Sequence, residues 1–163
     1  MPVRPLRERC GIPAPNRRGE IALGPYTLSV AKDCPISGGG LPLVVVSHGN
    51  RGCFLYLYDI AETLAMSALL LARSLIRADT TFDMSRFLSA CVERPTDIRR
   101  LIDFMPGAWP AASKIDSERI GFYGFSLSGY TGLVLIGTNP DWASGTEYCE
   151  RNPHLPGCEQ VRR

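Results

Sequence analysis

Small residues surround Ser126 in a pattern that suits a nucleophilic serine. Gly124 stands two residues before it, Ser128 and Gly129 follow it, and an apolar run lies on either side. A serine presented at a tight turn between a strand and a helix needs small neighbours, because the backbone there is cramped. Ser128 is a rival nucleophile, but Tyr130 would then occupy a position that needs a small residue. The spacing therefore predicts Ser126 as the nucleophile of an acyl transfer.

The same turn would supply hydrogen-bond donors for the negative charge that forms when a serine attacks a carbonyl group. The first N–H groups of a helix are unpaired and lie at the positive end of its dipole. The N–H of Leu127 is therefore one predicted oxyanion donor. A second donor normally comes from the loop after an earlier strand. That loop is residues 48–52 in this chain, and the N–H of Asn50 is the candidate.

A general base must remove the proton from Ser126, and histidine is scarce. The chain contains two histidines, His48 and His154. His154 follows Ser126 in the sequence and is the candidate base. His48 lies at the end of a predicted strand and is expected to shape the oxyanion loop. The possible acids downstream of the nucleophile are Asp141, Glu147 and Glu150. Acyl transfer through a serine requires no metal and no organic cofactor.

The elements that must position these residues alternate between strands and helices. Short, continuously apolar runs rich in β-branched residues predict strands that are buried on both faces of a parallel sheet. The predicted strands are a hairpin over 21–30 that is broken at Gly24-Pro25, and the runs 41–46, 69–72 and 120–125, with a continuing helix as the alternative for 69–72. The predicted helices are 59–65, a helix capped by Thr96 and stopped by Pro106-Gly107, and 130–137. The apolar face of the second helix is predicted from the helical spacing of Ile98, Leu101, Ile102 and Met105. This alternation predicts an α/β fold with a mostly parallel sheet and flanking helices.

Length and composition predict one globular domain and exclude several classes of partner. The 163 residues divide into an irregular arm over 1–19, rich in Pro, Arg and Gly, and a domain over 20–163. A net charge of +2 gives no basis for nucleic-acid binding. No apolar run approaches the roughly 20 residues that span a bilayer. The N-terminus lacks the apolar segment of a signal peptide, which predicts a cytoplasmic protein as written, or a periplasmic one if the N-terminus is incomplete.

Six cysteines are many for a cytosolic protein and few for a disulfide scaffold. Cys149 and Cys158 bracket a segment with two prolines and a glycine, which should fold back as a loop. A disulfide would close this loop in an oxidising compartment, and two free thiols are the alternative in a reducing one. A metal site formed by these cysteines and His154 would lack a fourth ligand. No metal site is therefore predicted.

Four segments of the chain carry a family resemblance. They are Ser-His-Gly-Asn-Arg-Gly at 47–52, Glu-Arg-Pro-Thr-Asp-Ile at 93–98, Ser-Lys-Ile-Asp-Ser-Glu-Arg-Ile-Gly at 113–121 and Gly-Phe-Ser-Leu-Ser-Gly-Tyr-Thr-Gly-Leu at 124–133. Together they resemble the predicted dienelactone-hydrolase-like branch of the α/β-hydrolases, near the platelet-activating-factor acetylhydrolases. The resemblance implies a serine hydrolase that acts on small carboxylic esters or lactones. It also implies that Ser126 is the nucleophile, with Asn50 and Leu127 as oxyanion donors.

The acid and the histidine of an α/β-hydrolase follow the nucleophile on later strands. Only 37 residues follow Ser126 (163 − 126), and a parallel crossover alone needs a dozen or more. We therefore expect an incomplete hydrolase domain, truncated before the last strands and impaired in hydrolysis. The strand before Ser126 would then have an open edge, which favours self-association. The alternative function is a non-catalytic remnant that acts as a binding or oligomerising module.

Overall fold

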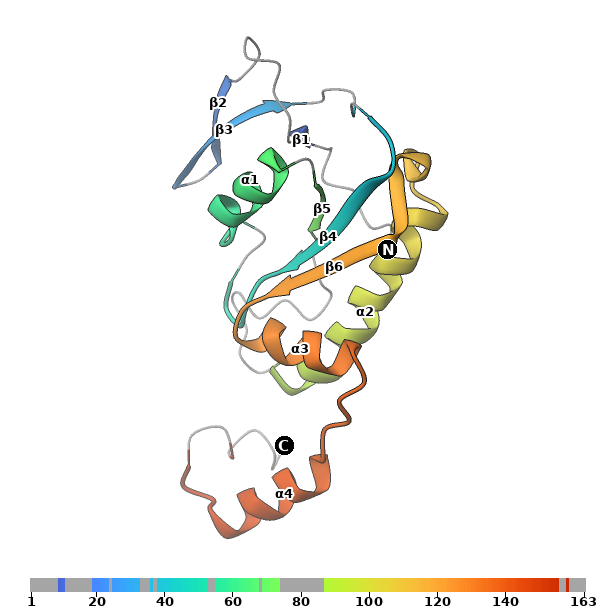
Figure 1. Cartoon of the computed structure of the whole chain (residues 1–163). Coiled ribbons are helices and arrows are strands. Elements are labelled where there is room, and N and C mark those ends of the chain that lie inside the picture. The colour runs from blue at the N-terminus through green and yellow to red at the C-terminus, as the bar shows by residue number, and fades with distance from the viewer. Residues whose placement is uncertain are drawn as a thin grey trace.

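The structure is a computed structural model, and it describes residues 9–10, 19–23, 25–32, 36, 38–52, 55–67, 69–73, 87–155 and 158. The strands are β1 (Arg9–Cys10), β2 (Gly19–Leu23), β3 (Tyr26–Lys32), β4 (Leu41–Ser47), β5 (Leu70–Arg73) and β6 (Ile115–Gly124). The helices are α1 (Tyr58–Met66), α2 (Phe87–Gly107), α3 (Leu127–Leu135) and α4 (Trp142–Arg151), with a 3₁₀ turn over Ala112–Lys114. From β4 to α3, strands and helices alternate along the chain (Figure 1).

β4 is the middle strand of a three-stranded parallel sheet, with β5 on one side and β6 on the other. The side chains of Leu43 and Val45 on β4 are fully buried, which accounts for the continuous apolar run in this strand. Ser47 lies opposite Gly124 in the β4–β6 register. Because both strands run in the same direction, the residues that follow them meet at one edge of the sheet. The parallel sheet and its flanking helices confirm the α/β character predicted from the sequence.

A second, antiparallel sheet forms near the N-terminus. β2 and β3 pair from Gly19 with Val30 to Leu23 with Tyr26, so the predicted hairpin is present. β1 pairs with the far end of β3. A short strand therefore lies within the arm that we expected to be irregular, because its backbone finds hydrogen-bond partners on β3. The other residues of the arm before Gly19 lie outside the described part of the chain.

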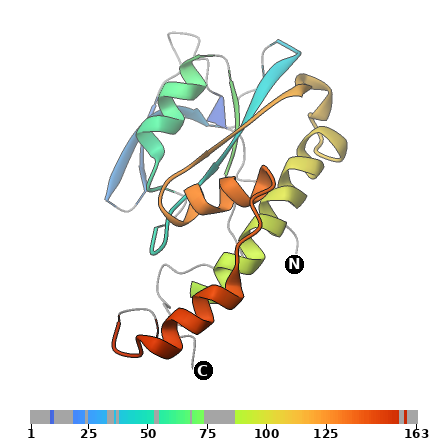
Figure 2. The same ribbon diagram turned by 60° about the horizontal axis from the view of Figure 1, so that its bottom comes forward.

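Helices cover both faces of the parallel sheet. α1 lies on one side of it, and α2 and α3 lie on the other (Figures 1 and 2). The predicted apolar face of α2 packs against the sheet through Ile98, Leu101 and Met105, which recur at helical spacing. The buried residues of this main core are Leu43, Val45, Ala72, Ile98, Leu101, Met105 and Trp109.

The predicted N-terminal boundary of α2 is wrong. The helix begins at Phe87 and runs through Pro95, so that Thr96 lies in mid-helix and is exposed instead of capping the helix. Proline removes a backbone donor and normally ends a helix. Here the first half of α2 is held by packing, since the buried Cys91 belongs to the same cluster as Leu127 of α3. Tertiary contacts outweigh the local proline signal.

The C-terminal elements begin earlier than predicted and include one helix that the sequence pattern did not predict. β6 begins at Ile115 and α3 begins at Leu127. α4 follows, and it projects from the body of the molecule (Figures 1 and 2). Its first residue, Trp142, packs edge-on against Tyr130 of α3, with ring centroids 6.3 Å apart. None of the described helices combines the length and the apolarity that a bilayer crossing requires.

β6 pairs with β4 and with no other strand in the described part of the chain. The other edge of β6 is therefore without a strand partner among these residues. This is the edge through which we expect self-association, and that expectation stays a prediction.

Replacement of Ile98 by alanine tests the core between α2 and the sheet. Ile98 is fully buried, and loss of a buried isoleucine side chain typically costs about 2–5 kcal/mol. We expect the free energy of unfolding in urea to fall by about 3 kcal/mol. Val92 on the same helix is 62% exposed, so Val92→Ala should change that free energy by less than about 0.5 kcal/mol. Equal losses in the two variants would contradict this placement of the core.

Candidate active site

Ser126 lies at the turn between the end of β6 and the start of α3, here called the Ser126 turn (residues 124–129). Its φ is 56° and its ψ is −119°, a conformation that costs an L residue about 1–3 kcal/mol. The residue is exposed. Arg51, in the loop after β4, is the other non-glycine residue with positive φ in the described part of the chain. Both strained residues thus follow neighbouring parallel strands at one edge of the sheet, a placement typical of functional sites.

Close packing within the Ser126 turn explains the need for Gly124. A Cβ at Gly124 would lie 2.6 Å from the carbonyl oxygen of Ser128, well inside van der Waals contact. A Cβ at Gly129 would lie 3.8 Å from the carbonyl oxygen of Gly124, which is an ordinary contact. Of the two glycines predicted to shape the turn, Gly124 is sterically required. Gly129 is not.

The first turn of α3 presents an unpaired backbone donor. The N–H of Ser128 donates to the carbonyl of Phe125 over 3.1 Å, and the N–H of Gly129 donates to the carbonyl of Ser126 over 2.8 Å. The N–H of Leu127 has no hydrogen-bond partner among the residues that the structure describes. It lies at the positive end of the helix dipole, directly after Ser126. It can therefore donate to an anion that forms beside the serine.

The loop after β4, here called the β4 loop (residues 48–52), packs directly against the Ser126 turn. A Cβ at Gly49 would lie 3.2 Å from the Cβ of Ser126 and 3.0 Å from the carbonyl oxygen of Phe125. Glycine at this position permits the close approach of the two turns. Asn50 follows Gly49 and is half-buried. The structure thus brings the loop that carries Asn50 beside the turn that carries Ser126.

A buried polar network that sequence reasoning missed lies beneath these two turns. The carbonyl oxygen of His48 accepts hydrogen bonds from the guanidinium of Arg94 (2.6 Å) and from the hydroxyl of Ser128 (2.5 Å). Ser128 Oγ also lies 2.7 Å from Ser47 Oγ and 3.3 Å from Arg94 Nη1. None of the four residues is more than 4% exposed. The sequence did contain one indication of this network. Arg94 stands four residues before Ile98, on the apolar face of α2, where a charged side chain is unusual.

His48 is engaged with its own loop. Its side chain is buried, and Nδ1 lies 2.9 Å from the carbonyl oxygen of Gly49. A Cβ at Gly52 would lie 3.3 Å from the Cβ of His48, so the loop closes tightly over this residue. Within the described chain the hydroxyl of Ser126 makes no hydrogen bond to another residue, and therefore none to His48.

Two titratable side chains lie behind the turn and are neutral at neutral pH. Burial raises the pKa of the Cys91 thiol, and the nearby Arg94 opposes this effect. Burial also raises the pKa of the Tyr130 hydroxyl. Neither group is therefore a base for Ser126 near pH 7.

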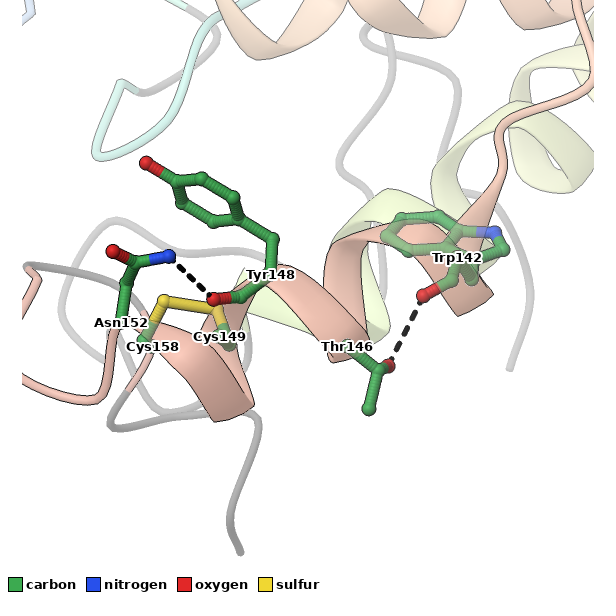
Figure 3. The surroundings of a disulfide bond; sticks show 6 residues. All are labelled: Trp142, Thr146, Tyr148, Cys149, Asn152 and Cys158. Carbon is green, nitrogen blue, oxygen red and sulfur yellow. Dashed lines mark hydrogen bonds between the residues drawn. A yellow bond between two sulfur atoms is a disulfide. The ribbon is translucent and has the colours of Figure 1, made fainter.

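The structure does not bring His154 to Ser126. His154 is exposed in the turn that follows α4, the helix that projects from the body (Figures 1 and 2). The loop that carries it is closed by a disulfide between Cys149 and Cys158 (Figure 3). Of the two alternatives left open by the sequence, the structure contains the disulfide. The two sulfur atoms are bonded to each other and not available as metal ligands.

The candidate acids belong to α4 and its N-terminal cap, and none of them has a hydrogen bond to Ser126. Asp141 accepts hydrogen bonds from the hydroxyl (2.6 Å) and the N–H (3.0 Å) of Ser144, and these bonds hold the pKa of its carboxyl below the usual range. Glu147 pairs with Arg151 one helical turn later, and Glu150 is exposed on the same helix. No cluster of three His, Cys, Asp or Glu side chains that could hold a metal ion occurs in the described residues.

Comparisons with protein-family models, with curated proteins and with solved structures found no match.

Alanine substitutions at the two glycines of the Ser126 turn should have opposite outcomes. In Gly124→Ala, the new Cβ would meet the carbonyl of Ser128, so we expect a loss of more than about 2 kcal/mol in the free energy of unfolding. In Gly129→Ala, the Cβ finds ordinary space within a helix, and a gain of up to about 1 kcal/mol is expected. Urea denaturation measures both. Similar losses in the two variants would contradict the packing described for the turn.

Loss of the disulfide should unfold α4 and leave the body folded. α4 has ten residues, and helices of this length are marginal in water on their own. The bridge joins cysteines nine residues apart, a constraint worth about 2–3 kcal/mol. A reductant should therefore lower the helical signal in far-UV circular dichroism without moving the main urea transition. It should have no effect on a Cys149→Ser/Cys158→Ser variant. A wild-type spectrum that reduction does not change would contradict this role.

Proposed function

We propose that the chain is a serine hydrolase of the carboxylic-ester or lactone type, with Ser126 as its nucleophile. The observation that carries the proposal is an exposed serine held at positive φ between a strand and the N-terminus of a helix. Such strain persists only where the surroundings enforce it. In strand–turn–helix sites its use is to present a nucleophile. The resemblance to the dienelactone-hydrolase-like branch supports the same reaction class.

The proposed reaction begins with attack of Ser126 Oγ on the carbonyl carbon of an ester or lactone, while the hydroxyl proton passes to solvent water at this exposed residue. The bond that forms moves negative charge to the carbonyl oxygen, where the N–H groups of Leu127 and Asn50 would donate hydrogen bonds. One such donor typically contributes about 2.7–4 kcal/mol to the transition state. Collapse of the intermediate breaks the bond to the alkoxide, which takes up a proton from water, and leaves an acyl group on Ser126. A second water molecule then attacks the acyl carbon, the bond to Ser126 Oγ breaks, and the acid leaves as the serine regains its proton.

Slow turnover is part of the proposal. A serine hydroxyl without an imidazole partner is a weak nucleophile at neutral pH. Neither His48 nor His154 bonds to Ser126 in the described chain. Oxyanion stabilisation and binding still accelerate acyl transfer by roughly 10³–10⁴-fold over water when triad members are missing. The proposed activity is of this residual kind.

A second candidate function is a non-catalytic module that binds a partner or a second copy through β6. The observation in its favour is that β6 is an edge strand among the described residues. Tyr123 on this strand and Phe125 after it are exposed, at 36% and 62%. In that case Ser126 would be unreactive.

Labelling with an excess of fluorophosphonate tests the proposal, because such a probe forms a covalent bond with a serine that lies beside oxyanion donors, slowly where no base is present. We expect peptide mass spectrometry of the labelled wild type to place the phosphonyl group on Ser126. Ser126→Ala should abolish the labelling, because no other described serine is presented in this way. The rate of p-nitrophenyl acetate hydrolysis should exceed that of Ser126→Ala by at least about tenfold.

Ser117→Ala provides a matched control. Ser117 is an exposed serine on the same strand, β6, and it has no part in the site. This variant should retain both the labelling and the hydrolysis rate. Equal hydrolysis rates for wild type and Ser126→Ala, together with no label on Ser126, would overturn the enzymatic proposal and favour the binding module.

A further inference from the structure

We propose that Arg94 and Ser128 are positioning residues, which fix the two halves of the oxyanion site against each other by binding one carbonyl oxygen. This inference rests on the proposed function. The two halves are the β4 loop, which carries Asn50, and the Ser126 turn, which carries Leu127. The shared carbonyl is that of His48. Arg94, Ser128 and this carbonyl are called the His48 clamp below.

The clamp joins three elements that are distant in the sequence. His48 directly follows β4, Arg94 lies in α2 and Ser128 lies in the first turn of α3. Ser128 is two residues after the nucleophile, and His48 is two residues before Asn50. A shift in either clamp bond therefore moves one predicted oxyanion donor relative to the other.

The hydrogen bonds around Ser128 use the full capacity of its hydroxyl. A hydroxyl group has one proton and can accept two hydrogen bonds. The Ser128 proton points to the carbonyl oxygen of His48, so the proton between the two serines must come from Ser47. Arg94 Nη1 supplies the second bond that Ser128 accepts. All the hydrogen-bonding capacity of the Ser128 hydroxyl is therefore used, and a buried hydroxyl held in this way has little freedom to move, as a positioning role requires.

The chemistry at position 128 also argues for a role beyond packing. In the usual nucleophile turn, G-x-S-x-G, a glycine stands two residues after the serine. Here a serine stands there, is fully buried and turns its hydroxyl toward the neighbouring strand end. A glycine could not make any of these bonds. The hydroxyl thus connects the turn to the loop that faces it.

The kinetics of fluorophosphonate labelling at Ser126 can detect this positioning. The phosphonyl oxygen occupies the oxyanion site during the reaction, so the maximal labelling rate depends on the geometry of the donors. The probe concentration that gives half of this rate, called half-saturation below, depends on how well the probe binds. Removal of an oxyanion donor typically lowers rates by about 10²–10³-fold, and displacement of one should have a smaller effect. We expect Ser128→Ala to lower the maximal rate about tenfold and to leave half-saturation unchanged within about twofold.

Variants at Arg94 provide an independent measurement through the same carbonyl. Arg94→Met keeps the apolar stem and removes the donor, and it should lower the maximal rate as Ser128→Ala does. Arg94→Lys keeps a cationic donor and should restore most of the rate. Because both residues act on one carbonyl, the loss in the double variant should be smaller than the product of the two single losses.

Ile98→Val is the control for a merely structural effect. Ile98 is buried one helical turn after Arg94 on α2 and makes no polar contact with the clamp. This variant should lower the melting temperature and leave the maximal labelling rate unchanged. Labelling is compared well below every variant's melting temperature.

The outcomes separate the two proposals. A wild type without label on Ser126 would overturn the proposed function itself. A labelled wild type whose maximal rate equals that of folded Ser128→Ala and Arg94→Met would overturn the clamp alone. A loss of rate in Ile98→Val as large as in those variants would also overturn it, since stability would then explain the effect.

Discussion

The carbonyl oxygen of His48 is the point on which the arrangement of the candidate site depends. It belongs to the first residue after β4, and it accepts hydrogen bonds from both α2 and α3. A buried carbonyl without partners costs free energy comparable to a lost hydrogen bond. The fold meets this requirement with the side chains of Arg94 and Ser128, and by doing so it ties the ends of two parallel strands to each other. The β4 loop and the Ser126 turn are adjacent for this reason.

Backbone strain at the site is tolerated because the surrounding contacts leave no alternative. The register places Ser47 opposite Gly124, so β6 must end beside the end of β4. α3 must then begin within two residues to pack against α2. Positive φ at Ser126 accomplishes this reversal, at a cost of about 1–3 kcal/mol. Gly49 and Gly124 make room for it, since a side chain at either position would contact the turn itself.

The sequence predicted those parts of the structure that local patterns determine. The apolar run of β4 and the spacing of Ile98, Leu101 and Met105 in α2 depend on one periodicity each, and both were confirmed. The small residues around Ser126 correctly indicated a strand, a tight turn and a helix. By contrast, the start of α2 depends on contacts with α3 that offset the effect of Pro95, and local rules favour a break there.

The clamp could not be derived from any local pattern either. His48 and Arg94 are 46 residues apart, and His48 and Ser128 are 80 apart. Only the assembled sheet brings them together. α4 escaped prediction for a different reason, because its sequence is largely polar and its support comes from Asp141, from a disulfide and from one aromatic contact. The apolar residues of α4 do fall on one face at helical spacing, but the pattern extends over only ten residues and was missed for that reason.

The site separates two contributions to catalysis that usually occur together. Stabilisation of a developing negative charge needs fixed donors, and the N–H of Leu127 at the start of α3 is such a donor without any proton transfer. Activation of the nucleophile needs a base, and in the described chain the hydroxyl of Ser126 has no such partner. The dipole of α3 favours the ionised form of Ser126 as well as the oxyanion, because both charges lie near its N-terminus. Under the proposed function, pre-organised electrostatics would therefore support acyl transfer at this serine without help from a protein base.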